Sequence, residues 1–114
     1  MPATQGLFPF QRLDVYRVAR AFAVAVKEAS IRHAELQDQA IRASISAFLT
    51  LAEGLPNKGA GMRRKYFTES NNSLHETMAA VDLASALGLV DPPQAARIQE
   101  LGLRFRKMLY ALRA

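Results

Sequence analysis

The chain contains no cysteine among its 114 residues, which excludes disulfide bonds, thiolate nucleophiles and cysteine-ligated metal sites. It has no run approaching the roughly 18 consecutive apolar residues that a membrane-spanning helix needs, so we expect no membrane association. The first residues, MPATQGLFPF, lack the basic start and the long apolar stretch of a secretory signal peptide. We therefore expect a cytoplasmic protein.

Motifs that carry catalysis or bind cofactors are also missing. The two histidines, His33 and His75, form no His-x₃-His pair, so we predict no metal site. The segment GLPNKGAG contains no GK[ST] and follows a helical pattern, which excludes a P-loop. No base is positioned by the sequence beside Ser46 or Ser73, and close helix packing explains both serines. We expect no catalytic residue, no cofactor and no enzymatic activity.

The sequence does have a helical spacing of apolar residues, which recur every three or four positions along most of the chain. We predict helices over residues 10–29, 34–53, 62–87 and 92–113, after a flexible tail at residues 1–8. Nothing indicates a strand, and a chain of this length suits one domain with a single core. Four helices with short connections favour an all-α, antiparallel up-down-up-down four-helix bundle over residues 9–114.

Two of these helices have a clear inward stripe. The first helix is expected to bury five apolar residues, Leu13, Val15, Val18, Phe22 and Val26. The fourth repeats apolar residues at intervals of three and four, at Ile98, Leu101, Phe105, Met108 and Leu112. Asp91 followed by a proline is typical of a helix start, and Gly88 is predicted to end the helix before it.

Residues 39–54, QAIRASISAFLTLAEG, are apolar on most sides of the predicted helix. A helix of this kind must be covered on most sides. We expect a second subunit to cover part of it, including Ile45, Phe48 and Leu49. The alternative is a central core helix enclosed by its own chain, and the sequence leaves both open.

A negative charge, Glu53, lies at the C-terminal end of this predicted helix. Gly54 is predicted to end it in the left-handed conformation, and Pro56 prevents its continuation. Glu53 would then face the negative end of the helix dipole. We therefore predict an ion pair between Glu53 and one of the cations just after it, which are Lys58, Arg63 and Arg64.

The short connection between the second and third helices predicts their register. Residues that face each other should have numbers that sum to about 116, counting outward from the loop. Ser46 would then lie level with residues 70–73. Arg42 would lie near Glu76, and we predict an ion pair between them.

Basic residues outnumber acidic residues, 15 to 10. One cluster surrounds the connection after the second helix, and another occupies the end of the fourth. In an antiparallel bundle both clusters lie at the same end, where they would form a patch that neutralises phosphates. The predicted nucleic-acid-binding residues are Lys58, Arg63, Arg64, Lys65, Arg104, Arg106, Lys107 and Arg113. The alternative is that these are ordinary solvated helix ends. Aromatic residues placed for stacking on bases are not evident.

A series of short motifs runs in order from residue 13 to residue 76. They are Leu13-Asp14-Val15-Tyr16, Ala19, Gln39, Arg42-Ala43, Ser46, Ala52-Glu53-Gly54, Phe67 and Ser73-Leu74-His75-Glu76. In this set the chain resembles the four-helix bundle family encoded in intervening sequences of 23S rRNA. Seven residues are expected to have a structural role, Gln39, Arg42, Ser46, Glu53, Gly54, Ser73 and Glu76.

The resemblance also implies partners. It implies a small non-enzymatic bundle, often a ring-like homopentamer. Its best understood relatives are accessory proteins of diversity-generating retroelements, which bind nucleic acid and a reverse transcriptase through a basic pentameric barrel. We therefore expect a homo-oligomer that binds RNA or DNA. The alternative is a protein-interaction scaffold that binds no nucleic acid.

Overall fold

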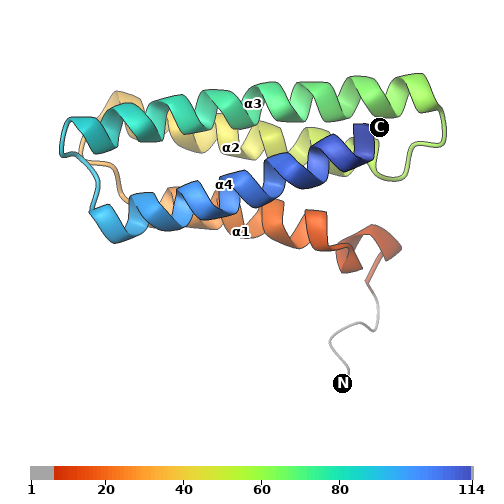
Figure 1. Ribbon diagram of the computed structural model, residues 1–114, viewed down its shortest axis with the longest axis horizontal. Helices are drawn as coiled ribbons and strands as arrows, with labels where there is room; N and C mark the ends of the chain where they lie inside the picture. The colour runs from red at the N-terminus through yellow and green to blue at the C-terminus, as the bar shows by residue number, and fades with distance from the viewer. Residues whose placement is uncertain (1–6, 114) are drawn as a thin grey trace.

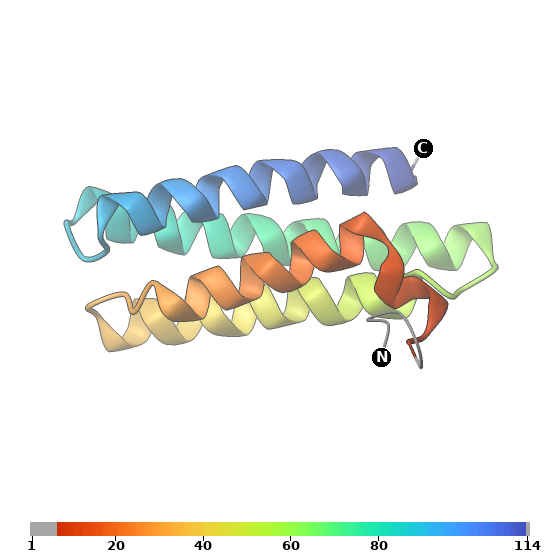
Figure 2. The ribbon, with the colours of Figure 1, turned by 90° about the horizontal axis from the view of Figure 1, so that it is seen from below.

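The computed structural model describes residues 7–113, which form four α-helices after a short 3₁₀ helix. The elements are η1 (Pro9–Arg12), α1 (Asp14–Glu28), α2 (Ala34–Gly54), α3 (Ala60–Ala86) and α4 (Pro92–Arg113). Figures 1 and 2 show the α-helices side by side along the long axis, with the chain reversing at each connection. Each helix packs against two neighbours in the cyclic order α1, α2, α3, α4. The predicted all-α four-helix bundle is confirmed.

The first predicted helix is interrupted near its start. Residues 1–6 of the predicted tail lie outside the described part of the chain. After η1, Leu13 adopts an extended conformation, with φ −73° and ψ 140°, before α1 begins. The interruption lets Phe10 pack edge-on against Tyr16, with ring centroids 5.4 Å apart. Residues six positions apart point in different directions on a continuous helix. Leu13 is 45% exposed as a result, so its predicted inward position is wrong.

The core lies along the axis of the bundle, and all four helices contribute to it. Its largest fully buried side chains are Phe22, Leu51, Phe67, Leu74, Ile98, Phe105 and Leu109. Phe22 and Phe105 meet edge to face across the α1–α4 contact, with centroids 6.1 Å apart. Apart from Leu13, the predicted stripes of the first and fourth helices are confirmed, with Met108 and Leu112 partly buried.

Helices α2 and α3 form the most extensive contact in the bundle. The Ser70 hydroxyl donates to the Ala47 carbonyl at 2.6 Å, and the Ser46 and Ser73 hydroxyls are 3.0 Å apart. These pairs confirm that Ser46 lies level with residues 70–73. Because the numbers rise along one helix as they fall along the other, the two helices run in opposite directions.

Gly54 has a different role from the predicted one. It is the last residue of α2, and its φ is not positive. Among the glycines of the described chain, Gly88 alone has a positive φ. A Cβ atom at Gly54 would lie 2.8 Å from the Phe67 ring and 2.9 Å from the Tyr66 Cβ. The glycine is therefore required by the close approach of α3, and the prediction of a left-handed helix end here is wrong.

The left-handed helix end lies at Gly88, as predicted, with φ 71°. The Leu89 N–H donates to the Ala84 carbonyl at 2.8 Å, and the Gly88 N–H donates to the Ser85 carbonyl at 3.1 Å. This pair of bonds is the Schellman arrangement, which satisfies the last carbonyls of α3.

Both predicted ion pairs are wrong. Within residues 7–113 the one pair closer than 4.0 Å joins Arg32 to Asp91, at 3.0 Å. Arg42, Glu53 and Glu76 are all exposed. Exposed pairs of long side chains gain little free energy, because water screens the charges and pairing costs side-chain entropy.

Candidate nucleic-acid interface

The structure brings the predicted basic clusters to the same end of the bundle. Figures 1 and 2 show the end of α4, the α2–α3 connection and the start of α1 at the same end of the bundle. We call residues 7–21, 45–73 and 103–113 the basic half; they include eleven Lys and Arg and three Asp and Glu. We call residues 22–44 and 74–102 the acidic half; they include four Lys and Arg and seven Asp and Glu. The formal charges of the two halves are therefore +8 and −3.

Most predicted phosphate-binding residues are accessible. Six of them are exposed, namely Lys58, Arg64, Lys65, Arg104, Arg106 and Lys107. In the described chain none of the six forms an ion pair with a carboxylate. Cations without a carboxylate partner keep their hydrogen-bond donors available for phosphate oxygens. The arrangement can therefore hold a polyanion at this end.

Arg63 differs from its neighbours because it is partly buried and already engaged. Its Nη1 donates to the carbonyls of Leu55, Asn57 and Gly54, at 2.7, 3.2 and 3.4 Å. Its guanidinium also lies 5.0 Å from the centroid of the Phe67 ring. These contacts satisfy carbonyls at the end of α2 and place a cation at the negative end of its dipole. Arg63 thus supplies the compensating charge that we had expected from a pair with Glu53.

Tyr110 is an aromatic residue at the basic end that the sequence did not single out. It is 48% exposed. The guanidiniums of Arg106 and Arg113 lie 4.9 and 5.5 Å from its ring centroid. Arg106 also donates to the Tyr110 hydroxyl at 3.4 Å. The ring orients two of the predicted phosphate-binding side chains.

The start of the chain adds three arginines to the basic half, Arg12, Arg17 and Arg20, all exposed. Sequence reasoning did not include them in the patch. A usable signal was present, because an up-down-up-down bundle places the start of its first helix beside the end of its fourth. The basic surface therefore extends onto α1.

A second surface feature is apolar and lies between α1 and α2. A groove of about 560 Å³ is lined by residues that include Val24, Ile41 and Ile45. Val24 and Ile45 are 49% and 46% exposed, and Leu49, one turn along α2, is 50% exposed. The reading of α2 as a helix enclosed by its own chain is wrong on this side. Ile45 and Leu49 are left uncovered as expected, whereas Phe48 is partly buried by its own chain, with its ring centroid 5.0 Å from that of Tyr16.

Metal and membrane sites are not indicated in the described residues. Across residues 7–113, no three His, Asp or Glu side chains come together as a metal site. None of the helices in the same range combines the length and the apolar composition needed to cross a bilayer.

A protein-family model described as 23S rRNA-intervening sequence protein matches residues 11–111. The chain belongs to this family. A comparison with curated proteins finds no match. The resemblance drawn from short motifs is thereby confirmed, and it extends over nearly the whole bundle.

The seven motif residues with an expected structural role lie on α2 and α3. Ser46 and Ser73 share a hydrogen bond, and Gly54 is buried against Phe67. The other four, Gln39, Arg42, Glu53 and Glu76, are exposed. The motif thus combines residues that set the approach of the two helices with residues on the outer surface.

Proposed function

We propose that this protein is a non-catalytic, self-associating bundle that binds nucleic acid through its basic half. The observation that supports nucleic-acid binding most strongly is the segregation of charge, +8 in one half and −3 in the other. A net charge of +5 spread evenly would give a weaker local field. Concentrating the cations at one end favours an approaching polyanion there and repels it from the other end.

The binding is expected to be electrostatic and therefore sensitive to salt. Each phosphate that is neutralised releases counterions, so the logarithm of the binding constant falls with the logarithm of salt concentration by about 0.7–0.9 per contact. The described residues include no motif that reads bases. We accordingly expect weak dependence on sequence, with contacts mainly to the sugar-phosphate backbone.

The test measures the affinity for RNA and DNA oligonucleotides across a salt series, with Arg64→Glu compared to Arg42→Glu. Both arginines are exposed, and both substitutions change the net charge equally. Arg64 lies in the basic half, whereas Arg42 lies in the acidic half. We expect Arg64→Glu to weaken binding by about tenfold and to lower the salt slope. Equal effects of the two substitutions, or no binding by the unaltered protein at low salt, would overturn the proposal.

Self-association is the second part of the proposal, and the uncovered apolar surface of α1 and α2 supports it. Monomeric proteins rarely leave large contiguous apolar surface in water. A ring of copies, such as the homopentamer that the resemblance implies, would place several basic ends near one another. Light scattering on the substitutions Ile45→Asp and Leu49→Asp tests this. Leu83→Asp on α3, where the leucine is 49% exposed, is the matched control.

The groove between α1 and α2 also favours a second function, a protein-interaction scaffold that binds no nucleic acid. Its partner would be a different protein, such as the reverse transcriptase that the resemblance implies. The two functions differ in their signatures. A scaffold would show flat nucleic-acid titrations at low salt, and it would remain monomeric until the partner is added. The cytoplasmic location expected from the sequence fits either function and stays a prediction.

A further inference from the structure

The contact between α1 and α4 contains a line of arginines that lies outside the predicted patch, except for Arg104. Two adjoining grooves, of about 230 and 310 Å³, both include Arg17 and Arg97 in their lining. Arg20 lines the first groove and Arg104 lines the second. The two grooves therefore form one seam lined by four arginines from two helices, with Arg20 at its edge.

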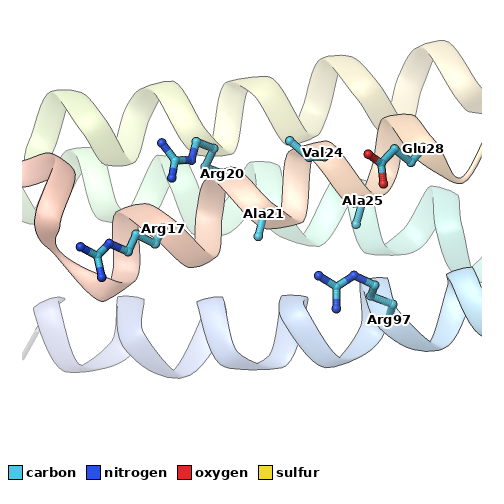
Figure 3. A pocket seen from close by; sticks show the side chains of 7 residues that line it. All are labelled: Arg17, Arg20, Ala21, Val24, Ala25, Glu28 and Arg97. Atoms are coloured by element: carbon cyan, nitrogen blue, oxygen red, sulfur yellow. The ribbon is translucent and has the colours of Figure 1, made fainter. Parts of the chain in front are cut away.

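The seam is open because its floor is made of small residues. Figure 3 shows Arg97 reaching from α4 toward α1, close to Ala21 and Ala25, with Arg17 and Arg20 further along α1. Ala25 is buried and Ala21 is partly buried. Alanine at these positions leaves space beside the Arg97 side chain, which a larger residue would fill.

The arginines of the seam have no carboxylate partners. Asp14, Glu28 and Glu100 also line the grooves. None of them lies within 4.0 Å of an arginine nitrogen, since the ion pair of the described chain is elsewhere. Arg20 contacts the Tyr16 ring, with its guanidinium 5.8 Å from the centroid. The guanidinium donors of the seam remain available to a ligand with several anionic oxygens.

The surroundings of the seam decide the class of anion. Helix α4 carries five Lys and Arg and one Glu, whereas α2 carries one Arg and three Asp and Glu. Arg97 and Arg104 are seven residues apart, which is about 10 Å along the helix axis. This length corresponds to about three phosphates at 3.4 Å per phosphate of one strand. A linear polyanion fits such a line better than a single phosphate does.

We propose that the α1–α4 seam is a phosphate track that continues the basic end patch along the side of the bundle. It binds the sugar-phosphate backbone of a nucleic-acid strand that has already engaged the end. Arg104 joins the patch to the track, Arg17 lies along its middle with Arg20 at its edge, and Arg97 marks its far part. This inference rests on the proposed nucleic-acid binding and assigns a path to it.

The experiment compares Arg97→Glu with Arg42→Glu on oligonucleotides of two lengths. Both arginines are exposed and lie in the acidic half, so the two variants have the same net charge and the same charge in each half. On a strand of about 24 nucleotides, we expect Arg97→Glu to weaken binding by about tenfold and to lower the salt slope by about 0.7 or more. On a strand of about 6 nucleotides, which reaches only the end patch, we expect less than about a twofold effect. Arg42→Glu should change neither affinity by more than about twofold.

Arg17→Ala provides a second variant, since it removes a side chain common to both grooves without introducing a negative charge. It should reproduce the dependence on length with a smaller loss. If Arg64→Glu weakens binding and the seam variants do not, the track is wrong while the end patch stands. If the unaltered protein binds neither oligonucleotide at low salt, both proposals are wrong. Thermal melts of all variants show whether each one is folded.

Discussion

The two halves of the bundle differ in more than charge. Of the nine Phe and Tyr residues, eight lie in the basic half, and the ninth, Phe22, lies just beyond its boundary. Apart from Phe22, the buried apolar side chains of the acidic half are aliphatic, among them Leu74, Val81 and Ile98. All four contacts between an arginine and an aromatic ring in the described chain involve arginines of the basic half.

This difference shows how a concentrated positive charge is tolerated in a small domain. Stacking on a ring orients a guanidinium without neutralising it, because the ring attracts the cation through its quadrupole. A carboxylate partner would instead cancel the charge and occupy its donors. The basic half thus keeps several arginines ordered while leaving their charge available to an anionic partner.

At each end of the molecule one arginine side chain forms hydrogen bonds that join neighbouring segments, and the two sets of bonds differ. Arg63 at the basic end is partly buried and donates to three carbonyls. Arg32 at the acidic end pairs with Asp91 and donates to the Gly88 carbonyl at 3.0 Å, in an exposed setting. The backbone N–H of Arg32 also donates to the Leu89 carbonyl at 2.8 Å. The acidic end is therefore joined partly through the backbone, whereas the basic end depends on a side chain.

The largest expected effect comes from removing the aromatic packing of the basic half. Phe67→Ala should lower the free energy of unfolding by about 3–5 kcal/mol, because Phe67 is fully buried and the substitution leaves a cavity. Phe8→Ala, at a ring that is 66% exposed, should change it by less than about 0.5 kcal/mol. Urea unfolding followed by circular dichroism measures both. Equal losses would show that burial does not explain the role of the aromatic residues.

A second comparison uses one glycine from each half. Gly54→Ala should destabilise the protein by about 1–3 kcal/mol, because the new Cβ meets Phe67 and the Cβ of Tyr66. At Gly102 a new Cβ would lie 2.9 Å from the Met78 sulfur, on a flexible side chain that can move, and 3.3 Å from Cε1 of the buried Phe22 ring. Alanine there also gains helix propensity of about 1 kcal/mol. We expect Gly102→Ala to be close to neutral in the same assay, and a reversed order would contradict the close approach of α3 to Gly54.

The hydrogen bonds of Arg63 and Arg32 give a third prediction. Arg63→Ala should lower the free energy of unfolding by about 1–2 kcal/mol, because it leaves partly buried carbonyls without a charged donor. Arg32→Ala should cost less than about 1 kcal/mol, because its ion pair is exposed and screened by solvent. Measuring the unfolding of both variants at low and at high salt distinguishes the two contributions. The Arg32 contribution should shrink with salt, and a stronger salt dependence at Arg63 would argue against its partly buried position.

The smallest effect is expected at the start of α2, in the acidic half. The His33 Nδ1 accepts a hydrogen bond from the Leu36 N–H at 3.2 Å, in the place where Asp is a better acceptor. His33→Asp should stabilise the protein by about 0.5 kcal/mol through this bond and the helix dipole. His33→Ala removes the acceptor and should cost about 0.5–1 kcal/mol. If both variants melt at the same temperature, the side chain does not cap the helix.

The sequence predicted the helices because their signals are local. The end of α3 at Gly88 follows from the chemistry of one glycine, and the inward face of α4 follows from its spacing of three and four residues. The break at Leu13 was missed because it depends on the contact between Phe10 and Tyr16. The close approach of α3 to Gly54 was missed because Phe67 lies thirteen residues further along the chain.

For the candidate site too, some features followed from local signals in the sequence and others depended on contacts between distant residues. The sequence by itself determined that two basic clusters share one end, since short connections force neighbouring helices to run in opposite directions. It also determined that α2 carries more apolar surface than its own chain covers. Only the tertiary structure decided that Arg17, Arg20 and Arg97 line one seam and that Arg63 is engaged with carbonyls. Those outcomes depend on distances between side chains of different helices, which helical spacing along one chain does not specify.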